Sequence, residues 1–287
     1  MSRALFGPAG NSESFYADGK KSTMQAFAWV KEKGLDAYEY QGGKGIYATD
    51  DTLRAMGKQA EEHGVAVSLH APYYISLSST EEEKRANSVN YILKSASASD
   101  LLGARVFVVH SGSASGTDRE DALKRAESTL YSAAQALEDG GFKAKAGLET
   151  MGKINQLGTL EEVIRLCRVS EKHFEPVVDF GHLNARTLGG IAGRDDFMRI
   201  FETISASLGA ERAERLHCHF SKIEYTKMGE KKHLTFEDTV YGPSYEQFIE
   251  AVASLGVHPT VICESDGTMA EDALTMKKYY EQKAAAE

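Results

Sequence analysis

The sequence is poor in several residue types that mark particular classes of protein. Only three of its 287 residues are cysteines, and no two of them form a CxxC pair. An odd and sparse set of cysteines argues against a disulfide framework. Two of them, Cys218 and Cys263, fall inside short apolar runs, so we expect small buried thiols.

Long apolar runs and an excess of positive charge are missing too. No stretch approaches the length of a membrane-spanning helix, and Arg3–Gly7 predicts a first strand rather than the longer apolar core of a signal peptide. We therefore expect a cytoplasmic protein without membrane contacts. The formal net charge of −9 argues against broad nonspecific binding to nucleic acid, because that binding depends on Lys and Arg contacts with phosphate.

The chain does have a regular alternation of strand-like and helix-like patterns. With 42% hydrophobic and 26% charged residues it can bury a sizeable core. The predicted strands are Arg3–Gly7, Leu35–Tyr40, Val65–His70, Arg105–His110, Lys145–Glu149, Pro176–Phe180, Arg215–Phe220 and Pro259–Glu264. The predicted helices are Ser22–Lys33, Asp50–His63, Ser79–Leu102, Thr117–Leu137, Thr159–Val169, Asp195–Leu208, Ser244–Leu255 and Met269–Gln282.

Eight strands that alternate with eight helices, without a linker, predict one α/β domain over residues 1–287 with the fold of a (β/α)8 TIM barrel. A doubly wound open sheet is the alternative. The connection from Ser221 to Pro243 is long, which is typical of a functional loop. We expect the tail, Ala284–Glu287, to be frayed.

Residues that can bind metal gather where the predicted strands end. The candidates are His70, His110, Glu149, Asp179, His182, His217, His219, Glu230, His233 and Glu264. A single histidine at a strand end is more often a hydrogen-bonded structural residue than a ligand. In a barrel, however, the carboxyl ends of all strands meet at the active site. Imidazoles and carboxylates without paired thiols suit zinc, manganese or similar ions, and a carboxylate such as Glu149 can bridge two of them.

Several short motifs point to a particular family. They are Leu69–Leu77 (LHAPYYISL), Val109–Ser113 (VHSGS), Leu148–Thr150, Leu157-Gly158, Val178–His182 (VDFGH), Leu216-His217, Ser221-Lys222, His233 and Cys263-Glu264. Along nearly its whole length the chain resembles the endonuclease IV family of apurinic/apyrimidinic endonucleases, within the superfamily of xylose-isomerase-like barrels. The His-Ala-Pro-Tyr and His-Ser-Gly segments are fairly specific to that family, whereas Asp-x-x-His also occurs in sugar isomerases and epimerases.

The resemblance implies a centre of three zinc ions. It implies a first ion on His70, His110 and Glu149, and a second on Glu149 as a bridge with Asp179, His217 and Glu264. A third ion would use His182, His233 and an Asp two residues before His233. That position is Lys231 here, and the nearest acid is Glu230. We therefore expect two zinc ions, with a third dependent on Glu230 and with manganese as an alternative metal.

The resemblance also implies an activity and a partner. It implies hydrolysis of the phosphodiester 5′ to an abasic site in DNA, a step of base excision repair, by a hydroxide that bridges the metals, with Glu149 and Glu264 in the catalytic centre. Tyr73 matches a tyrosine of the family that contacts DNA. We expect Gln41 and Lys222 to contact DNA as well, from the loops after the second and seventh strands, and the protein to be a monomer.

Two other functions remain open. A metal-dependent sugar isomerase or epimerase of the same superfamily would use one metal on a Glu-Asp-His-Glu quartet, which Glu149, Asp179, His217 and Glu264 reproduce. The additional histidines have no reason to converge in such an enzyme. A metal-retaining binding protein without activity is the third hypothesis, because the loop Tyr40–Lys44 lacks the Arg that the family inserts into DNA.

Overall fold

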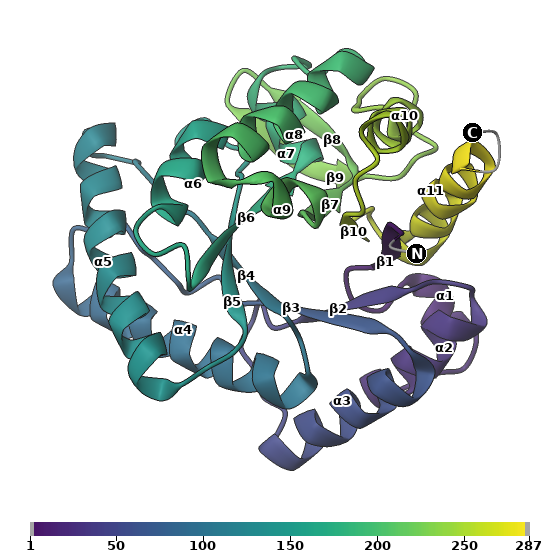
Figure 1. Ribbon diagram of the computed structural model, residues 1–287, viewed down its shortest axis with the longest axis horizontal. Helices are drawn as coiled ribbons and strands as arrows, with labels where there is room; N and C mark the ends of the chain where they lie inside the picture. The colour runs from purple at the N-terminus through teal and green to yellow at the C-terminus, as the bar shows by residue number, and fades with distance from the viewer. Residues whose placement is uncertain (1–2, 285–287) are drawn as a thin grey trace.

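Eight parallel strands form a barrel in the computed structural model, which describes residues 3–284 (Figure 1). The strands are β1 (Leu5–Pro8), β2 (Ala37–Gln41), β3 (Ala66–His70), β4 (Val106–His110), β5 (Lys145–Glu149), β6 (Phe174–Asp179), β7 (His217–Phe220) and β10 (Thr260–Cys263). Their order around the sheet is β1-β10-β7-β6-β5-β4-β3-β2. The predicted single-domain TIM barrel is therefore confirmed.

Backbone hydrogen bonds between β1, β2 and the residues that flank them bring the two ends of the sheet together, which distinguishes the barrel from the open sheet. The amide of Asp36 donates to the carbonyl of Phe6 at 2.9 Å, and the amide of Gly10 donates to the carbonyl of Glu39 at 3.0 Å. Strand ends that are far apart in the sequence consequently share one rim.

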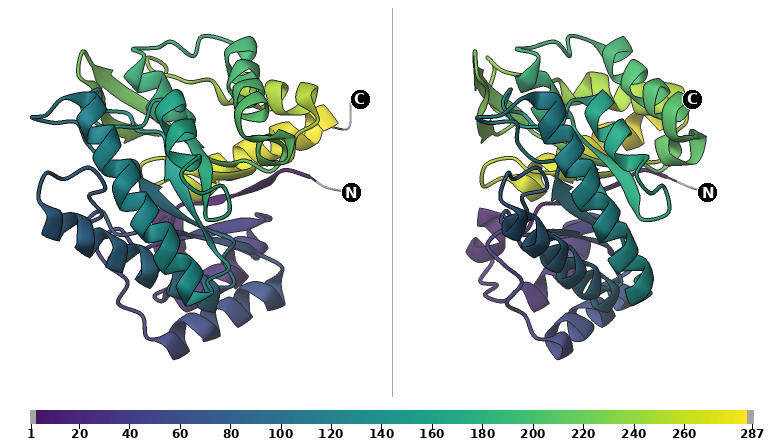
Figure 2. Two further views of the ribbon diagram at one scale, coloured as in Figure 1. Left: turned by 60° about the vertical axis from the view of Figure 1, so that its left-hand side comes forward. Right: turned by 90° about the vertical axis from the view of Figure 1, so that its left-hand side faces the viewer.

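Helices surround this barrel, as Figures 1 and 2 show. They are α1 (Glu13–Ala17), the 3-10 helix η1 (Thr23–Gln25), α2 (Ala26–Glu32), α3 (Asp50–His63), α4 (Glu82–Leu102), α5 (Arg119–Gly140), α6 (Leu160–Cys167), α7 (Phe180–Arg186), α8 (Arg194–Leu208), α9 (Ala210–Glu214), α10 (Tyr245–Leu255) and α11 (Met269–Ala284). The long helices begin where sequence signals predict them. Thr159, for example, forms a capping box with Glu162 at the start of α6.

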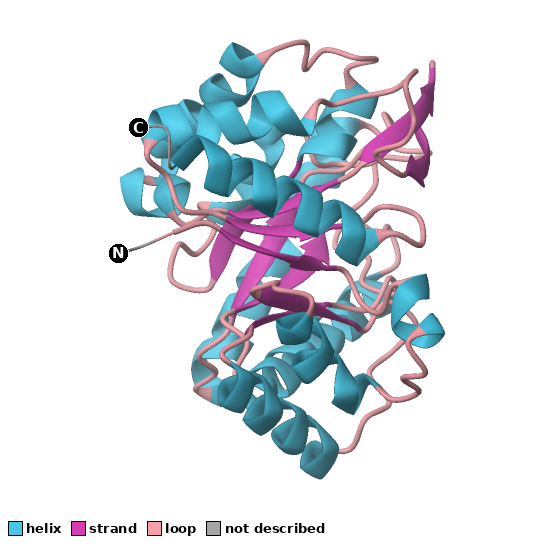
Figure 3. Cartoon of the chain, turned by 90° about the vertical axis from the view of Figure 1, so that its right-hand side faces the viewer, coloured by secondary structure: helices cyan, strands magenta, loops and turns pink. Residues whose placement is uncertain are grey.

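Three features differ from the prediction. The helix expected from Ser22 begins as the 3-10 helix η1, and the short helices α1, α7 and α9 were not predicted. The long connection after β7 is an antiparallel hairpin of β8 (Lys222–Thr226) and β9 (Gly229–Leu234) rather than a loop. Figure 3 shows this hairpin apart from the barrel sheet, on the side opposite the start of β1. The predicted frayed tail lies mostly outside the described residues.

The core has two parts, because alternate residues of each strand face the helices and the barrel interior. Phe180 shows the outer part, since its ring packs against those of Phe197, Phe220 and Phe248. A small inner cluster consists of Val106, Val108 and Val177. No helix within residues 3–284 has the length and apolarity needed to cross a membrane.

We predict that Gly7→Ala destabilises the protein at the seam between β1 and β2. A Cβ atom at position 7 would lie only 1.8 Å from the carbonyl oxygen of Ala37, so the two strands would have to move apart. The expected loss in the free energy of unfolding is about 3 kcal/mol, the upper part of the range for overpacking. Urea unfolding measures it, and an unchanged midpoint would contradict the tight seam.

Candidate metal centre

Ligand atoms form four groups: three lie at the carboxyl ends of the barrel strands and on the adjoining α7 and hairpin, and a fourth, of Glu39, His217 and His219, lies deeper between the strands. Within each group the ligand atoms lie within 4.8 Å of one another. The first group is His70, His110 and Glu149; the second is Glu149, Asp179, His219 and Glu264; the third is His182, Glu230 and His233. All nine residues of these three groups were among the candidates in the sequence; eight of them were assigned to a metal ion, and His219 was not.

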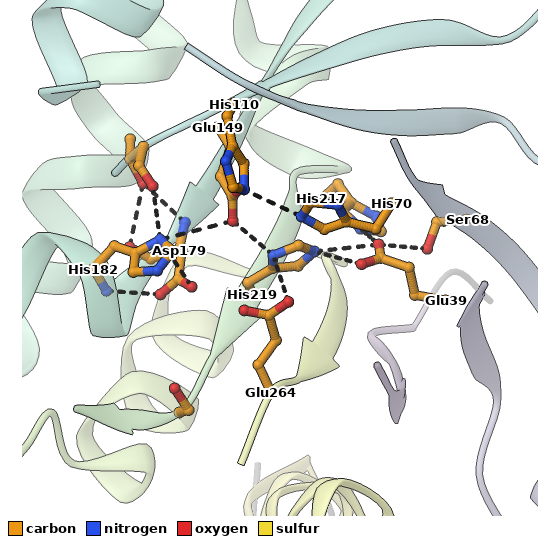
Figure 4. Close-up of polar contacts among 12 residues, drawn as sticks. Glu39, Ser68, His70, His110, Glu149, Asp179, His182, His217, His219 and Glu264 are labelled. Carbon is orange, nitrogen blue, oxygen red and sulfur yellow. Dashed lines mark hydrogen bonds and ion pairs between the residues drawn. The ribbon is translucent and has the colours of Figure 1, made fainter. Parts of the chain in front are cut away.

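Glu149 belongs to two of the groups. Its Oε2 atom lies 3.4 Å from Nε2 of His110 and 3.8 Å from Nε2 of His70. Its Oε1 atom lies 2.8 Å from Nδ1 of His219. The carboxylate is 1% exposed and stands between the two groups, as Figure 4 shows. Its position fits the predicted bridging carboxylate.

The structure places His219, not His217, in the second group, which corrects the sequence-based assignment. His217 and His219 are two residues apart on β7, so both side chains point into the barrel. His219 lies nearer the carboxyl end and pairs in register with Asp179. His217 lies deeper, with Nε2 3.1 Å from a carboxylate oxygen of Glu39. The motif match selected His217, whereas the position along the strand would have favoured His219.

A β-bulge in the hairpin explains how Glu230 joins the third group. Tyr225 pairs with Glu230, and the preceding Glu224 pairs with Lys232, so Lys231 is an extra residue in β9. The extra residue reverses the alternation of side chains, and Glu230 and His233, three residues apart, reach the same site. Oε2 of Glu230 lies 3.5 Å from Nε2 of His182. Lys231 instead forms a salt bridge with Glu224 at 2.5 Å.

We predict that Glu230→Gln removes the third zinc ion, whereas Lys231→Ala leaves the zinc content unchanged. The first substitution takes a carboxylate from the third group, and the second alters a neighbour whose side chain points to Glu224. Elemental analysis of the two purified variants after zinc loading and dialysis measures the ions per chain. Equal zinc content in both variants would contradict the bulge assignment.

Several of these histidines are oriented by a hydrogen bond from the ring nitrogen that points away from the ligand group. Nδ1 of His70 lies 3.0 Å from the carbonyl oxygen of Ala71, and Nδ1 of His182 lies 3.0 Å from that of Thr150. A carbonyl only accepts, so each Nδ1 carries a proton, and Nε2 is the nitrogen left for a metal. Zinc-binding histidines are usually held in this way, with the second ring nitrogen bonded to a carbonyl or a carboxylate.

Unsatisfied buried oxygens show that the residues fit the metals that the family resemblance implies. Oε2 of Glu149 and Oδ2 of Asp179 are buried and have no hydrogen-bond partner among residues 3–284. A buried carboxylate oxygen without a partner is costly. The donor set of imidazole nitrogens and carboxylate oxygens is the one that zinc or manganese accepts. Metal ions in these groups would take up both oxygens.

The pKa values show how strongly charge is concentrated here. Burial opposes ionisation of Glu149, yet the surrounding imidazoles, His219 foremost, hold the pKa of this carboxyl well below its usual value. Burial lowers the pKa of His110 to about 3, so this imidazole is neutral and free to bind a metal. Burial also opposes protonation of His182, but Asp179 and Glu149 raise its pKa to about 9.

A small cavity opens directly onto the groups. It has a volume of about 190 Å³ and is lined by ligand residues together with Tyr73, Met151, Lys153 and Gln156. A neighbouring depression of about 350 Å³ includes Gln41 and shares Tyr73, His233 and Glu264 with it. Two of the predicted DNA contacts, Tyr73 and Gln41, therefore lie at the mouth of the site. Lys153 also lies there and was not predicted.

Lys222, the third predicted DNA contact, is engaged elsewhere. Its ammonium group donates hydrogen bonds to the carbonyl oxygens of Phe236 and Asp238, and so stabilises the segment that follows the hairpin. Contact of Lys222 with phosphate would have to compete with these hydrogen bonds, and its role toward DNA stays a prediction.

Comparison with known proteins defines the family. The model of the family described as xylose isomerase-like TIM barrel matches residues 27–281. The chain belongs to this family. An uncharacterised protein of Methanocaldococcus jannaschii is 31% identical over 277 residues, which are 96% of this chain and 97% of that one. A protein of Thermoplasma acidophilum named "Probable endonuclease 4" is 27% identical over 67% of this chain and 66% of its own length.

Solved structures agree on the fold. Endonuclease IV from Thermus thermophilus superimposes over the full length of both chains with a TM-score of 0.70 at 15% identity. A D-tagatose 3-epimerase-like protein superimposes over 93% of this chain and 94% of its own with a TM-score of 0.69 at 21% identity. The sequence match to proteins named endonuclease 4 confirms the resemblance to that family, and the solved structures show that both kinds of enzyme share this barrel.

Proposed function

We propose that this protein is a zinc-dependent endonuclease that hydrolyses the phosphodiester 5′ to an abasic site in DNA. The observation that carries the proposal is the convergence of three ligand groups around one cavity. Paired metal ions suit phosphodiester hydrolysis, because they stabilise both the attacking and the leaving oxygen. The relatives named as endonuclease 4 support the same conclusion.

The histidines beyond the quartet distinguish this proposal from an isomerase. Glu149, Asp179, His219 and Glu264 alone would suffice for one metal ion. A sugar isomerase or epimerase remains the second candidate because this quartet is complete. An isomerase gives no reason, however, for a separate third group, in which His182 of α7 meets Glu230 and His233 of the hairpin at the same cavity.

Different residues of this chain would bind the metal ions and the DNA. The three groups would hold the ions, which when bound supply Lewis acidity and a nucleophile at neutral pH. Tyr73 packs its ring 5.3 Å from that of His70 and 5.2 Å from that of His110, at the mouth of the cavity. There it would contact the sugar of the abasic nucleotide. Lys153, which also lines the cavity, would contact the phosphate.

An abasic nucleotide needs less free energy than an intact one to leave the duplex and enter the cavity. A nucleotide without a base has no stacking or pairing to lose, so it leaves the duplex more easily than an intact one. The narrow cavity of about 190 Å³ fits a sugar-phosphate unit better than a complete nucleotide. We therefore expect discrimination against undamaged DNA to come mainly from extrusion of the lesion.

Cleavage of a labelled duplex with one abasic-site analogue tests the proposal. Zinc-loaded protein should make a single cut on the 5′ side of the lesion, leave the matched undamaged duplex intact, and lose activity when a chelator removes the metal. Epimerisation of ketohexoses by the same preparation is measured in parallel. Sugar conversion without any DNA cut would overturn the proposal in favour of the isomerase.

A further inference from the structure

A buried carboxylate, Glu39 on β2, lies beneath these three ligand groups and forms the fourth, deeper group with His217 and His219. The side chain is fully buried. Its Oε1 atom lies 3.1 Å from Nε2 of His219, and its Oε2 atom lies 3.1 Å from Nε2 of His217. The hydroxyl of Ser68 donates a hydrogen bond to Oε2 at 2.8 Å. His217 and Ser68 hold Oε2, the amide of Gln41 donates to Oε1 at 3.4 Å, and Nε2 of His219 lies within 3.2 Å of both oxygens.

His219 is the ring that lies between Glu39 and the second ligand group, as Figure 4 shows. On the opposite side, its Nδ1 lies 2.8 Å from Glu149 and 3.5 Å from Glu264. An ionised carboxylate only accepts hydrogen bonds, and a neutral imidazole has one N–H and one lone pair. A bond from Nε2–H to Glu39 therefore leaves the lone pair of Nδ1 directed at the second group.

This arrangement is the reverse of that at the other oriented histidines. His70 and His182 bond through Nδ1 to backbone carbonyls, which leaves Nε2 for a metal. Nδ1 of His233 lies 2.8 Å from the hydroxyl of Ser221 in the same way. No carbonyl or hydroxyl within residues 3–284 is bonded to Nε2 of His219, so Glu39 is the acceptor that keeps a proton on this nitrogen when Nδ1 faces a metal.

We propose that Glu39 is a positioning residue that fixes the tautomer and the ring orientation of His219 so that Nδ1 binds the metal of the second group. The inference rests on the proposed metal centre and does not require the nuclease activity. His217 and Ser68 hold the carboxylate in place, which gives the deeper histidine a supporting role instead of the ligand role that the sequence suggested.

The first test needs no variant. Long-range ¹H–¹⁵N correlation spectra of zinc-loaded protein with labelled histidine report which nitrogen of each ring carries the proton. His70 and His182 should carry it on Nδ1, and His219 should carry it on Nε2. Zinc bound to Nε2 of His219 would overturn the proposal.

The second test is Glu39→Gln. An amide can donate as well as accept, so Nε2 of His219 is no longer forced to carry the proton. We expect the affinity for one zinc ion, measured by competition with a chromophoric chelator, to fall about 10–100-fold, as is usual when the carboxylate behind a zinc-binding histidine is lost. If the variant does not fold, the spectrum of the wild-type protein still decides the question.

Glu175→Gln is the matched control. Glu175 is also a buried glutamate, on β6 at the opposite end of the barrel, where it forms a salt bridge with Arg105 at 3.2 Å. This substitution should leave every zinc affinity unchanged. Wild-type zinc affinity in Glu39→Gln, or an equal loss in both variants, would contradict the positioning role. Because neither readout involves DNA, a failure here is distinct from a failure of the cleavage assay.

Discussion

Glu149→Gln is expected to lower the rate of abasic-site cleavage by about 1,000-fold. Loss of a ligand shared by two ions should remove about 4 kcal/mol of transition-state stabilisation, since each 1.4 kcal/mol changes the rate about tenfold. Glu149 is the residue that joins the first and second groups. An amide binds zinc poorly and carries no charge, so both ions lose a ligand. Single-turnover cleavage at saturating protein measures the effect.

The fold should survive this substitution. The buried Oε2 atom of Glu149 has no hydrogen-bond partner within the described chain, and an amide fills nearly the same volume. Circular dichroism and the thermal midpoint of the metal-free protein serve as controls, with Glu175→Gln for comparison. Cleavage within tenfold of the wild-type rate would show that Glu149 does not bridge two metals.

The pair His219→Gln and His217→Gln should separate the two histidines of β7. His219→Gln removes a nitrogen from the second group, so we expect zinc affinity at that group to fall by more than about 100-fold, since even an outer partner of a zinc ligand contributes 10–100-fold. In His217→Gln the amide can still donate to Glu39, so the ion should remain bound. Zinc titration of both variants measures the difference.

The reverse result would restore the assignment that the motif suggested. If His217→Gln lost an ion and His219→Gln kept it, then β7 would have to bind metal from a deeper position, two residues further from the carboxyl end. The observed register, in which Asp179 lies beside His219, would not permit that arrangement without a shift of the strand.

Much of this site follows from the sequence because strand ends are easy to recognise. His70, His110 and Glu149 are each the last residue of their strand, and the barrel brings strand ends together whatever the loops do. Short apolar runs that end in a histidine or an acid therefore predicted both the fold and the main ligands. That prediction did not require the register of hydrogen bonds between neighbouring strands.

The parts that sequence reasoning missed depend on local register. The choice between His217 and His219 depends on how far β7 extends, which a difference of two residues decides. The role of Glu230 depends on a β-bulge, and no residue type in the hairpin sequence predicts that bulge. Glu39 is in the middle of a strand, and only the closed barrel shows that it faces β7 across the interior.

Anomalous diffraction at the zinc edge from crystals of the zinc-loaded protein is the most direct test of a metal centre with several ions. The structure predicts separate peaks at the first and second groups, joined through Glu149, and a further peak between His182, Glu230 and His233. A single peak within Glu149, Asp179, His219 and Glu264, with the other histidines free of metal, would contradict the account.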